Sequence, residues 1–293
     1  MDKKKIPLIK EYRVSKLKEC LQCVDRYFLN REKQRDCILD LYPNKKGKSL
    51  EHRGKSIFRG MVLPSLRCLG LIIGHADSIK ASANGKLIII ENEDDQKLHQ
   101  RILRAITYEV DKDIFKFIPI IKNSPMPKKE FIQKISNKIE GVSEKQKIER
   151  IDKWLSILHQ VELINYSSSH IILINKKKYK QTIDDVNVDM KNFKNFKEYF
   201  FESYFELSRK YAGVVNITDL REYICLKMLK SHKGILTENQ FDEMLSRVLS
   251  ERKEYIISLG RPWGAREKLF KFEGNSYKTI IVKKYQKEDD KNG

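Results

Sequence analysis

The residues of this sequence whose chemistry is best defined by type and spacing are basic, and they lie between Ser49 and Lys86. An arginine side chain can donate two hydrogen bonds to guanine O6 and N7, and lysine or serine can bind phosphate oxygens. Five such residues have the spacing of one helix face, and we predict that they contact double-stranded DNA. The alternative interpretation is a solvated charged surface. The five candidates are Arg53, Lys55, Ser56, Arg59 and Arg67.

A second set of candidates for DNA binding lies outside this stretch. Three belong to the outer face of another predicted helix, and six are basic residues of loops, of a hairpin strand and of the N-terminal arm, residues 1–13. A basic arm without hydrophobic periodicity is either disordered or an extended segment that lies along a DNA groove. These candidates are Lys145, Gln146 and Arg150 on the helix, and Lys4, Lys10, Arg13, Lys46, Lys80 and Arg261 elsewhere.

The basic stretch itself is predicted to form a helix followed by a β-hairpin. Ser49 is a candidate N-cap, and Gly70 is a candidate helix stop. Residues 71–73 and 78–81 flank a short polar turn, as the strands of a hairpin do, and Asn84-Gly85 marks the next break. Apolar residues recur at the 3–4 spacing of one buried helix face, and they are Ile57, Met61, Val62, Leu66 and Leu69.

With helices expected at 14–29 and 31–41, this is the layout of a winged helix-turn-helix, in which one helix enters the major groove of DNA. The alternative is a basic helix on an unrelated α+β domain. We expect the same layout twice more. In the second unit Ser143 resembles a helix N-cap, a hairpin of residues 163–166 and 170–174 follows, and Lys176–Lys180 leads into a polar linker. The third unit has predicted helices at 218–230 and 237–252 and strands at 254–259, 268–273 and 277–283.

The predicted fold class is therefore mostly α with small β-wings (α+β), built from tandem winged helix-turn-helix units. The predicted boundaries are 1–111 for the arm and first unit, 112–190 for the second unit and 191–293 for the third. The second and third units could form one subdomain.

The charge of the chain favours a polyanionic partner. The formal net charge is +19 over 293 residues, and lysines and arginines that neutralise phosphates release condensed counterions. An anionic membrane would also suit this charge. However, no stretch approaches the roughly 20 apolar residues that span a bilayer, and no apolar segment follows MDKKK as in a secretory signal. We therefore expect nucleic acid rather than a membrane, and a cytoplasmic protein.

The five cysteines form a sparse, odd-numbered set, which predicts reduced thiols in a chain without a signal peptide. Cys20 and Cys23 have the CxxC spacing of half a zinc site. Both lie on or beside the apolar face of a predicted helix, and no second pair of ligands completes a tetrahedral set. We therefore interpret them as core residues.

No arrangement of side chains in the sequence predicts an active site. A magnesium-dependent nuclease needs two or three carboxylates and a lysine that converge to hold the metal and activate water. The closest match to such a motif is Asp77 followed by Asp95-Gln96-Lys97. However, Asp77 lies in a predicted turn and Asp95 lies near a predicted helix start, so the two carboxylates need not converge. The sequence contains no phosphate-binding glycine loop. We expect no catalytic residue, no metal site and no cofactor in this chain.

The segment FRGMVLPSLRCLGLI, followed by the predicted wing and ANGKLI, resembles the DNA-binding parts of restriction-system proteins. Three successive winged-helix-like units after a basic arm are similar to the recognition half of type IIS restriction endonucleases of the FokI kind. The resemblance implies a bacterial, monomeric fragment that binds an asymmetric duplex site. It also implies that a separate nuclease domain, with magnesium, cuts the DNA.

Two other functions fit the same sequence features. A replication initiator or transcription regulator can also be built from winged helices, and a regulator commonly dimerises on a palindromic site. The other alternative is a complete magnesium-dependent nuclease within these residues.

Overall fold

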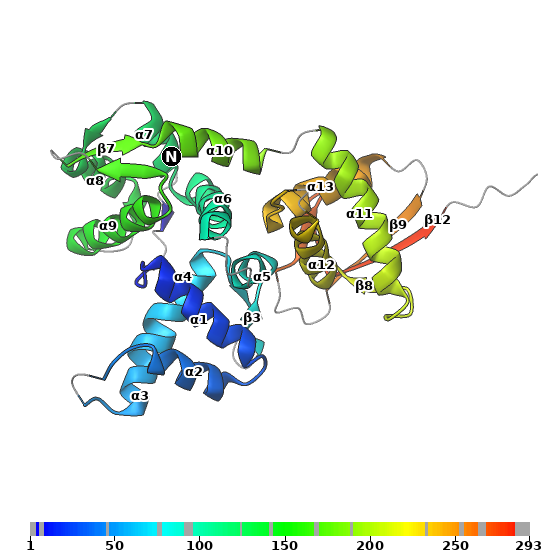
Figure 1. Cartoon of the computed structure of the whole chain (residues 1–293), viewed down its shortest axis with the longest axis horizontal. Coiled ribbons are helices and arrows are strands. Elements are labelled where there is room, and N and C mark those ends of the chain that lie inside the picture. The colour runs from blue at the N-terminus through cyan, green and yellow to red at the C-terminus, as the bar shows by residue number, and fades with distance from the viewer. Residues whose placement is uncertain are drawn as a thin grey trace, which may run out of the picture. The chain divides into compact units, whose positions relative to one another are not determined.

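The computed structural model describes residues 4–5, 9–44, 47–74, 78–90, 96–123, 125–140, 143–166, 170–187, 190–231, 234–251, 255–262 and 268–284. They belong to two compact units, 1–186 and 187–293 (Figure 1). Both are mostly helical with small antiparallel sheets, which confirms the α+β class. Nearly all of the segments predicted as first and second units fall within the first compact unit. Among the described residues, no helix is long and apolar enough to cross a bilayer.

The N-terminal half of the first compact unit contains the basic stretch. Its helices and hairpin follow the predicted order of three helical segments and two short strands. These elements are α1 (Val14–Arg26), α2 (Arg31–Asp40), α3 (Leu50–Arg53), the π-helix η1 (Gly54–Val62), α4 (Leu63–Cys68), β2 (Ile72–Ile73), β3 (Lys80–Ala81) and α5 (Ala83–Ile89).

The predicted basic helix is confirmed as the continuous run α3–η1–α4. Ser49 caps it by accepting the N–H of His52, and Gly70 follows its end with a φ of +65°. The central nine residues form a π-helix, in which each N–H binds the carbonyl five residues earlier. This wider turn changes which residues face the core.

The π-helix makes the predicted apolar face partly wrong. Phe58 is buried, whereas Ile57 and Met61 are only half-buried. The prediction assumed 3.6 residues per turn, and a π-helical stretch rotates the later side chains away from those positions. Gly60 fits this backbone because a Cβ there would lie 2.9 Å from the carbonyl oxygen of Lys55.

The hairpin after the basic helix is confirmed, with Ile72 opposite Ala81 in an antiparallel pair. The break predicted at Asn84-Gly85 is wrong, because both residues lie in the first turn of α5. Ser82 caps that helix by accepting the N–H of Gly85. Gly85 is needed for close packing, since a Cβ would lie 2.2 Å from the carbonyl oxygen of Leu71.

The remainder of the first compact unit has a second helical segment with a three-stranded sheet. From α7 onward its elements follow the order helix, strand, helix, helix, strand, strand, and the sheet order is β4-β7-β6. The short strand β5 pairs elsewhere. These elements are α6 (Gln96–Ile114), α7 (Phe117–Asn123), β4 (Met126–Pro127), α8 (Lys128–Ser136), β5 (Ile139–Glu140), α9 (Glu144–Gln160), β6 (Ile164–Tyr166), β7 (Ile171–Ile174) and α10 (Lys176–Val186).

The second compact unit repeats this order and this sheet. Its sheet order is β8-β12-β9, so that the first strand pairs with the last and the last pairs with the second. A separate hairpin, β10–β11, is inserted before the last strand. The elements are α11 (Met190–Ser208), β8 (Val215–Asn216), α12 (Ile217–Lys230), α13 (Glu238–Glu251), β9 (Tyr255–Gly260), β10 (Phe270–Phe272), β11 (Asn275–Tyr277) and β12 (Thr279–Lys284).

The N-terminal segment is packed into the first compact unit. Strand β1 (Lys4–Lys5) pairs in parallel with β5. Ile9 and Glu11 are 2% and 1% exposed. The hydroxyl of Ser65 accepts the backbone N–H groups of Lys10 and Glu11, and Gln160 binds the backbone of Tyr12 and Val14. Disorder is therefore the wrong alternative for residues 9–13, because helices α4 and α9 both hold them.

Candidate nucleic-acid interface

The middle of the basic helix presents three exposed polar side chains. Lys55 forms a 2.6 Å ion pair with Glu51, one turn earlier, and Ser56 donates to the carbonyl of His52. The guanidinium of Arg59 has neither an ion pair nor a hydrogen bond within the described part of the chain. Arg59 is therefore the side chain of this face best placed to bind an external acceptor.

The two outer arginines of the predicted face have structural contacts. Arg53 is half-buried, and its Nη2 donates 2.6 Å hydrogen bonds to the carbonyl of Leu39, in the last turn of α2, and to that of Tyr42, just after the helix. Arg67 is exposed and contacts the carbonyl of Gly74 at 3.4 Å. Desolvation lowers the pKa of Arg67, and the charge of Arg31 lowers it further. Arg53 thus anchors the helix, while Arg67 lies at its edge.

The first turn of α9 presents the second predicted group. Ser143 caps the helix by accepting the N–H of Gln146 at 3.4 Å. The side chains of Lys145 and Gln146 are exposed, and Ile148, which follows them, is 43% exposed. Arg150 is half-buried and has an interaction partner. This helix end therefore combines a cation, an amide and an apolar side chain, which are groups that can contact phosphates and base edges.

Arg13 is held by a buried carboxylate. Its Nε and Nη2 donate to Glu11 over 2.9 and 2.7 Å, and Tyr42 donates its hydroxyl to the same carboxylate over 2.6 Å. Burial raises the pKa of Glu11, but the hydrogen bonds from Arg13 and Tyr42 outweigh it, so the pKa lies below its ordinary value. The guanidinium of Arg13 therefore stabilises the packed N-terminal segment.

The other predicted contacts are dispersed. Lys10 is exposed in the N-terminal segment, and Lys80 is half-buried on β3 with an interaction partner. Arg261 is exposed after β9 in the second compact unit, and Lys4 belongs to β1. Lys46 lies outside the described residues.

Within the described part of the chain, no group of three or more histidine, cysteine, aspartate or glutamate side chains could hold a metal ion. Asp77 and Asp95, the nearest approach to a nuclease motif, lie outside the described residues.

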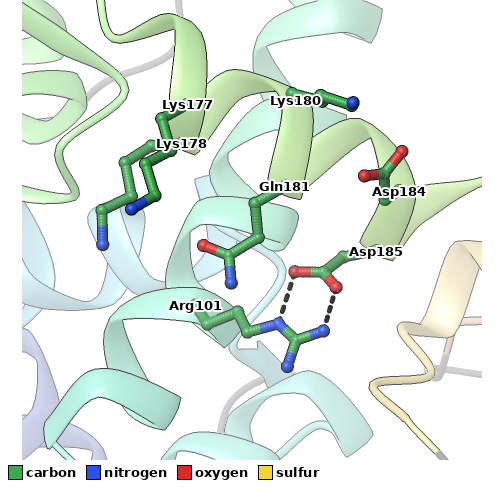
Figure 2. A pocket seen from close by; sticks show the side chains of 7 residues that line it. All are labelled: Arg101, Lys177, Lys178, Lys180, Gln181, Asp184 and Asp185. Atoms are coloured by element: carbon green, nitrogen blue, oxygen red, sulfur yellow. Dashed lines mark hydrogen bonds and ion pairs between the residues drawn. The ribbon is translucent and has the colours of Figure 1, made fainter.

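One basic site was missed by the sequence reasoning. The run Lys176–Lys180, predicted to lead into a linker, begins helix α10, which packs on α6 through Tyr179 and Thr182. Asn175 helps to start this helix by accepting the N–H of Lys178. Side chains of α6 and α10 line a pocket (Figure 2). The run of lysines was the available signal, but it does not reveal the arginines of α6 opposite.

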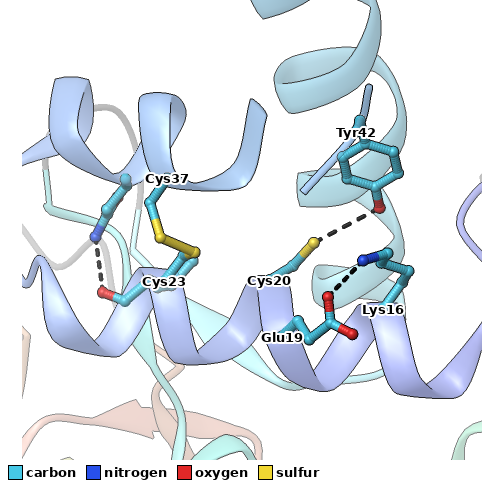
Figure 3. Close-up of a disulfide and its surroundings, with 8 residues drawn as sticks. Lys16, Glu19, Cys20, Cys23, Cys37 and Tyr42 are labelled. Carbon is cyan, nitrogen blue, oxygen red and sulfur yellow. Dashed lines mark hydrogen bonds and ion pairs between the residues drawn. A yellow bond between two sulfur atoms is a disulfide. The ribbon is translucent and has the colours of Figure 1, made fainter. Parts of the chain in front are cut away.

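The cysteines correct another expectation. Cys23 of α1 and Cys37 of α2 form a disulfide, with 5.8 Å between their Cα atoms (Figure 3). The prediction of reduced thiols is wrong for this pair, because the packing of α1 against α2 brings the two residues together. Cys20 is completely buried, 3.6 Å from the hydroxyl of Tyr42, which confirms its place in the core.

No protein-family model, curated protein or solved structure matches this chain.

Proposed function

We propose that this chain binds double-stranded DNA sequence-specifically through winged helix-turn-helix units. The observation that carries the proposal is the recurrence of one element order, helix, strand, helix, helix, strand, strand, with the same strand order in both three-stranded sheets. In a winged helix-turn-helix, the third helix of this order enters the major groove and the last two strands form the wing. The corresponding helices here are α9 and α13.

The two helices differ in charge, which selects α9 as the helix that contacts DNA. The first turn of α9 exposes Lys145 and Gln146 beside Glu144, and the whole helix carries four lysines or arginines and three carboxylates. Helix α13 carries one arginine and four carboxylates, of which Glu243 and Glu251 are exposed. Acidic side chains are repelled by the phosphates on either side of the groove. N-terminal residues of a recognition helix are the ones that reach base edges, which agrees with the position of Lys145 and Gln146.

The basic helix of residues 50–68 is proposed as a second contact. Two short strands follow it, as in a wing, and Arg59 projects from it without a partner among the described residues. The net charge of +19 supports a partner with many phosphates.

The resemblance to type IIS restriction endonucleases suggests the biological role of this DNA binding. The chain would be the target-recognition module, monomeric and bound to an asymmetric site in the bacterial cytoplasm. Cleavage would belong to a separate magnesium-dependent nuclease domain, and this chain would have no catalytic activity.

The experiment is selection of bound duplexes from a random pool, followed by affinity measurements at several salt concentrations. If six to ten phosphates are contacted, affinity should fall about 10³–10⁵-fold between ~50 and ~200 mM salt. Lys145→Ala should weaken binding, whereas Lys112→Ala, which removes an exposed lysine at the end of α6, should not.

Three results would overturn parts of the proposal. A log–log salt slope near zero would exclude DNA as the main partner. A dimer on a palindromic site would favour a transcription regulator over a restriction module. Magnesium-dependent cleavage by the purified chain would show that it contains a nuclease.

A further inference from the structure

A pocket of about 480 Å³ lies between α6 and α10 in the first compact unit. This volume lies in the range of small-molecule sites. Figure 2 shows Lys177, Lys178 and Gln181 directed from α10 towards α6, which contributes Arg101. The lining residues are Arg101, Lys177, Lys178, Lys180, Gln181, Asp184 and Asp185.

The acidic residues of the lining only partly offset its cations. Both carboxylate oxygens of Asp185 accept hydrogen bonds from Arg101, so the charges of these two side chains offset each other. Glu162, just outside the lining, lies 3.1 Å from the ammonium of Lys178 and 3.6 Å from Nη1 of Arg104. One carboxylate, itself 41% exposed, is thus shared by two cations.

The buried cation behind the pocket is Arg104. It is 2% exposed, and within the described structure its Nε and Nη1 have no hydrogen-bond partner. Its Nη2 donates over 3.1 Å to the side-chain oxygen of Gln181. A buried charge with incomplete compensation is costly, and an anion nearby would reduce that cost.

The hydrogen bond from Arg104 also orients Gln181. Because Oε1 accepts from the guanidinium of Arg104, the amide Nε2 is left as a donor, and Figure 2 shows it directed towards Arg101, with the amide oxygen on the side of Lys177 and Lys178. The local group contains five cationic side chains and three carboxylates, so two positive charges are in excess. A phosphate group carries close to two negative charges at neutral pH.

We propose that the pocket between α6 and α10 binds a phosphate group. Lys177, Lys178 and the Gln181 amide donate to its oxygens, and Arg104 is a positioning residue that acts through Gln181. The phosphate belongs either to a small phosphorylated molecule of nucleotide size or to the backbone of a nucleic acid. This site is independent of the proposed contacts of α9 and of the basic helix.

The test is isothermal titration calorimetry, in which inorganic pyrophosphate is added to the full chain at low salt. We expect saturable binding that Lys177→Ala weakens about tenfold, the usual cost of a lost charged hydrogen bond. Lys176→Ala is the matched control, because Lys176 is an exposed neighbour that does not line the pocket. It should change the affinity less than twofold.

A second variant, Gln181→Glu, tests the role of the amide donor. The variant keeps an acceptor for Arg104 but replaces the amide donor with a negative oxygen, so it should abolish pyrophosphate binding without lowering the thermal unfolding temperature. Absence of saturable binding by the unaltered chain, or equal losses in the Lys176 and Lys177 variants, would overturn the proposal.

Duplex DNA distinguishes the two sources of phosphate. If Gln181→Glu also weakens DNA binding and pyrophosphate competes with DNA, the pocket binds backbone phosphate. If DNA affinity is unchanged while pyrophosphate binding is lost, the ligand is a small phosphorylated molecule. Pyrophosphate binding by a chain with no affinity for DNA would reject the proposed function and leave this site standing.

Discussion

The indole Nε1 of Trp154 donates a 3.0 Å hydrogen bond to Oδ1 of Asp111, whose side chain is completely buried. The same carboxyl group accepts the backbone N–H groups of Phe117 and Ile118 at the start of α7. Helices α6, α7 and α9 therefore meet at one buried acceptor. Burial raises the pKa of Asp111 to about 7, although these three hydrogen bonds oppose the shift.

The raised pKa of Asp111 predicts a pH dependence of stability. An aspartate in the unfolded chain titrates near ~3.9. The neutral carboxyl of Asp111 therefore makes its full contribution to the free energy of unfolding below about pH 4. This contribution is lost as the pH rises to about 7. Urea unfolding of the wild type and of Asp111→Asn at pH 5 and pH 8 measures this difference. Identical pH slopes for the two proteins would contradict the assignment.

Arg59→Ala should reduce sequence discrimination. A bidentate contact of arginine with guanine contributes about 1–3 kcal/mol, so the variant should lose that much on the selected duplex and little on random DNA. Arg26→Ala, which removes an exposed arginine outside the proposed interface, is the control. Equal losses on both duplexes would instead indicate a phosphate contact.

Two neighbouring residues separate the structural and binding roles of the N-terminal segment. Ile9 is buried, and Ile9→Ala should lower the free energy of unfolding by about 2–5 kcal/mol. Lys10 is exposed, and Lys10→Ala should change it by less than about 0.5 kcal/mol. If Lys10 contacts a phosphate, the salt slope of DNA binding should become shallower by about one. An unchanged slope would make this segment purely structural.

The disulfide between Cys23 and Cys37 should stabilise the first compact unit. Closing a loop of this length contributes about 3 kcal/mol. Urea unfolding with and without reductant should therefore show a loss of that order in the wild type. A Cys23→Ser, Cys37→Ser double variant should not respond to reductant. A wild-type chain that is equally stable in both conditions would show that the bond is not formed in solution.

Structural features that depend on residues within one helical turn were predicted well from the sequence. The caps at Ser49 and Ser143 and the helix stop at Gly70 depend on residues within a few positions of each other. The hairpin strands were also predicted, because short apolar segments flank polar turn residues at these positions. These features explain why the order of elements could be predicted along most of the chain.

The structural features that were not predicted depend mostly on contacts between elements that are distant in the sequence. Over nine residues, the wider turn of the π-helix gives no sequence signal that separates it from an α-helix, so the burial of Phe58 was not predicted. Helix α10 forms in a lysine-rich run because Tyr179 and Thr182 pack on α6. Arg53 resembles its exposed neighbours in sequence, but the end of α2 supplies carbonyls that bind it.

The bonds between Gln160 and the backbone of Tyr12 and Val14 impose an order of events during synthesis. Val14 is synthesised 146 residues before its partner, so the N-terminal segment can bind Ser65 of α4 early but cannot complete its docking until α9 has been made. Contacts of such long sequence separation form late because the intervening chain must first be ordered. Until then the backbone of Tyr12 and Val14 lacks its bonds to Gln160, and α1, α2 and the basic helix must be held together by their own contacts.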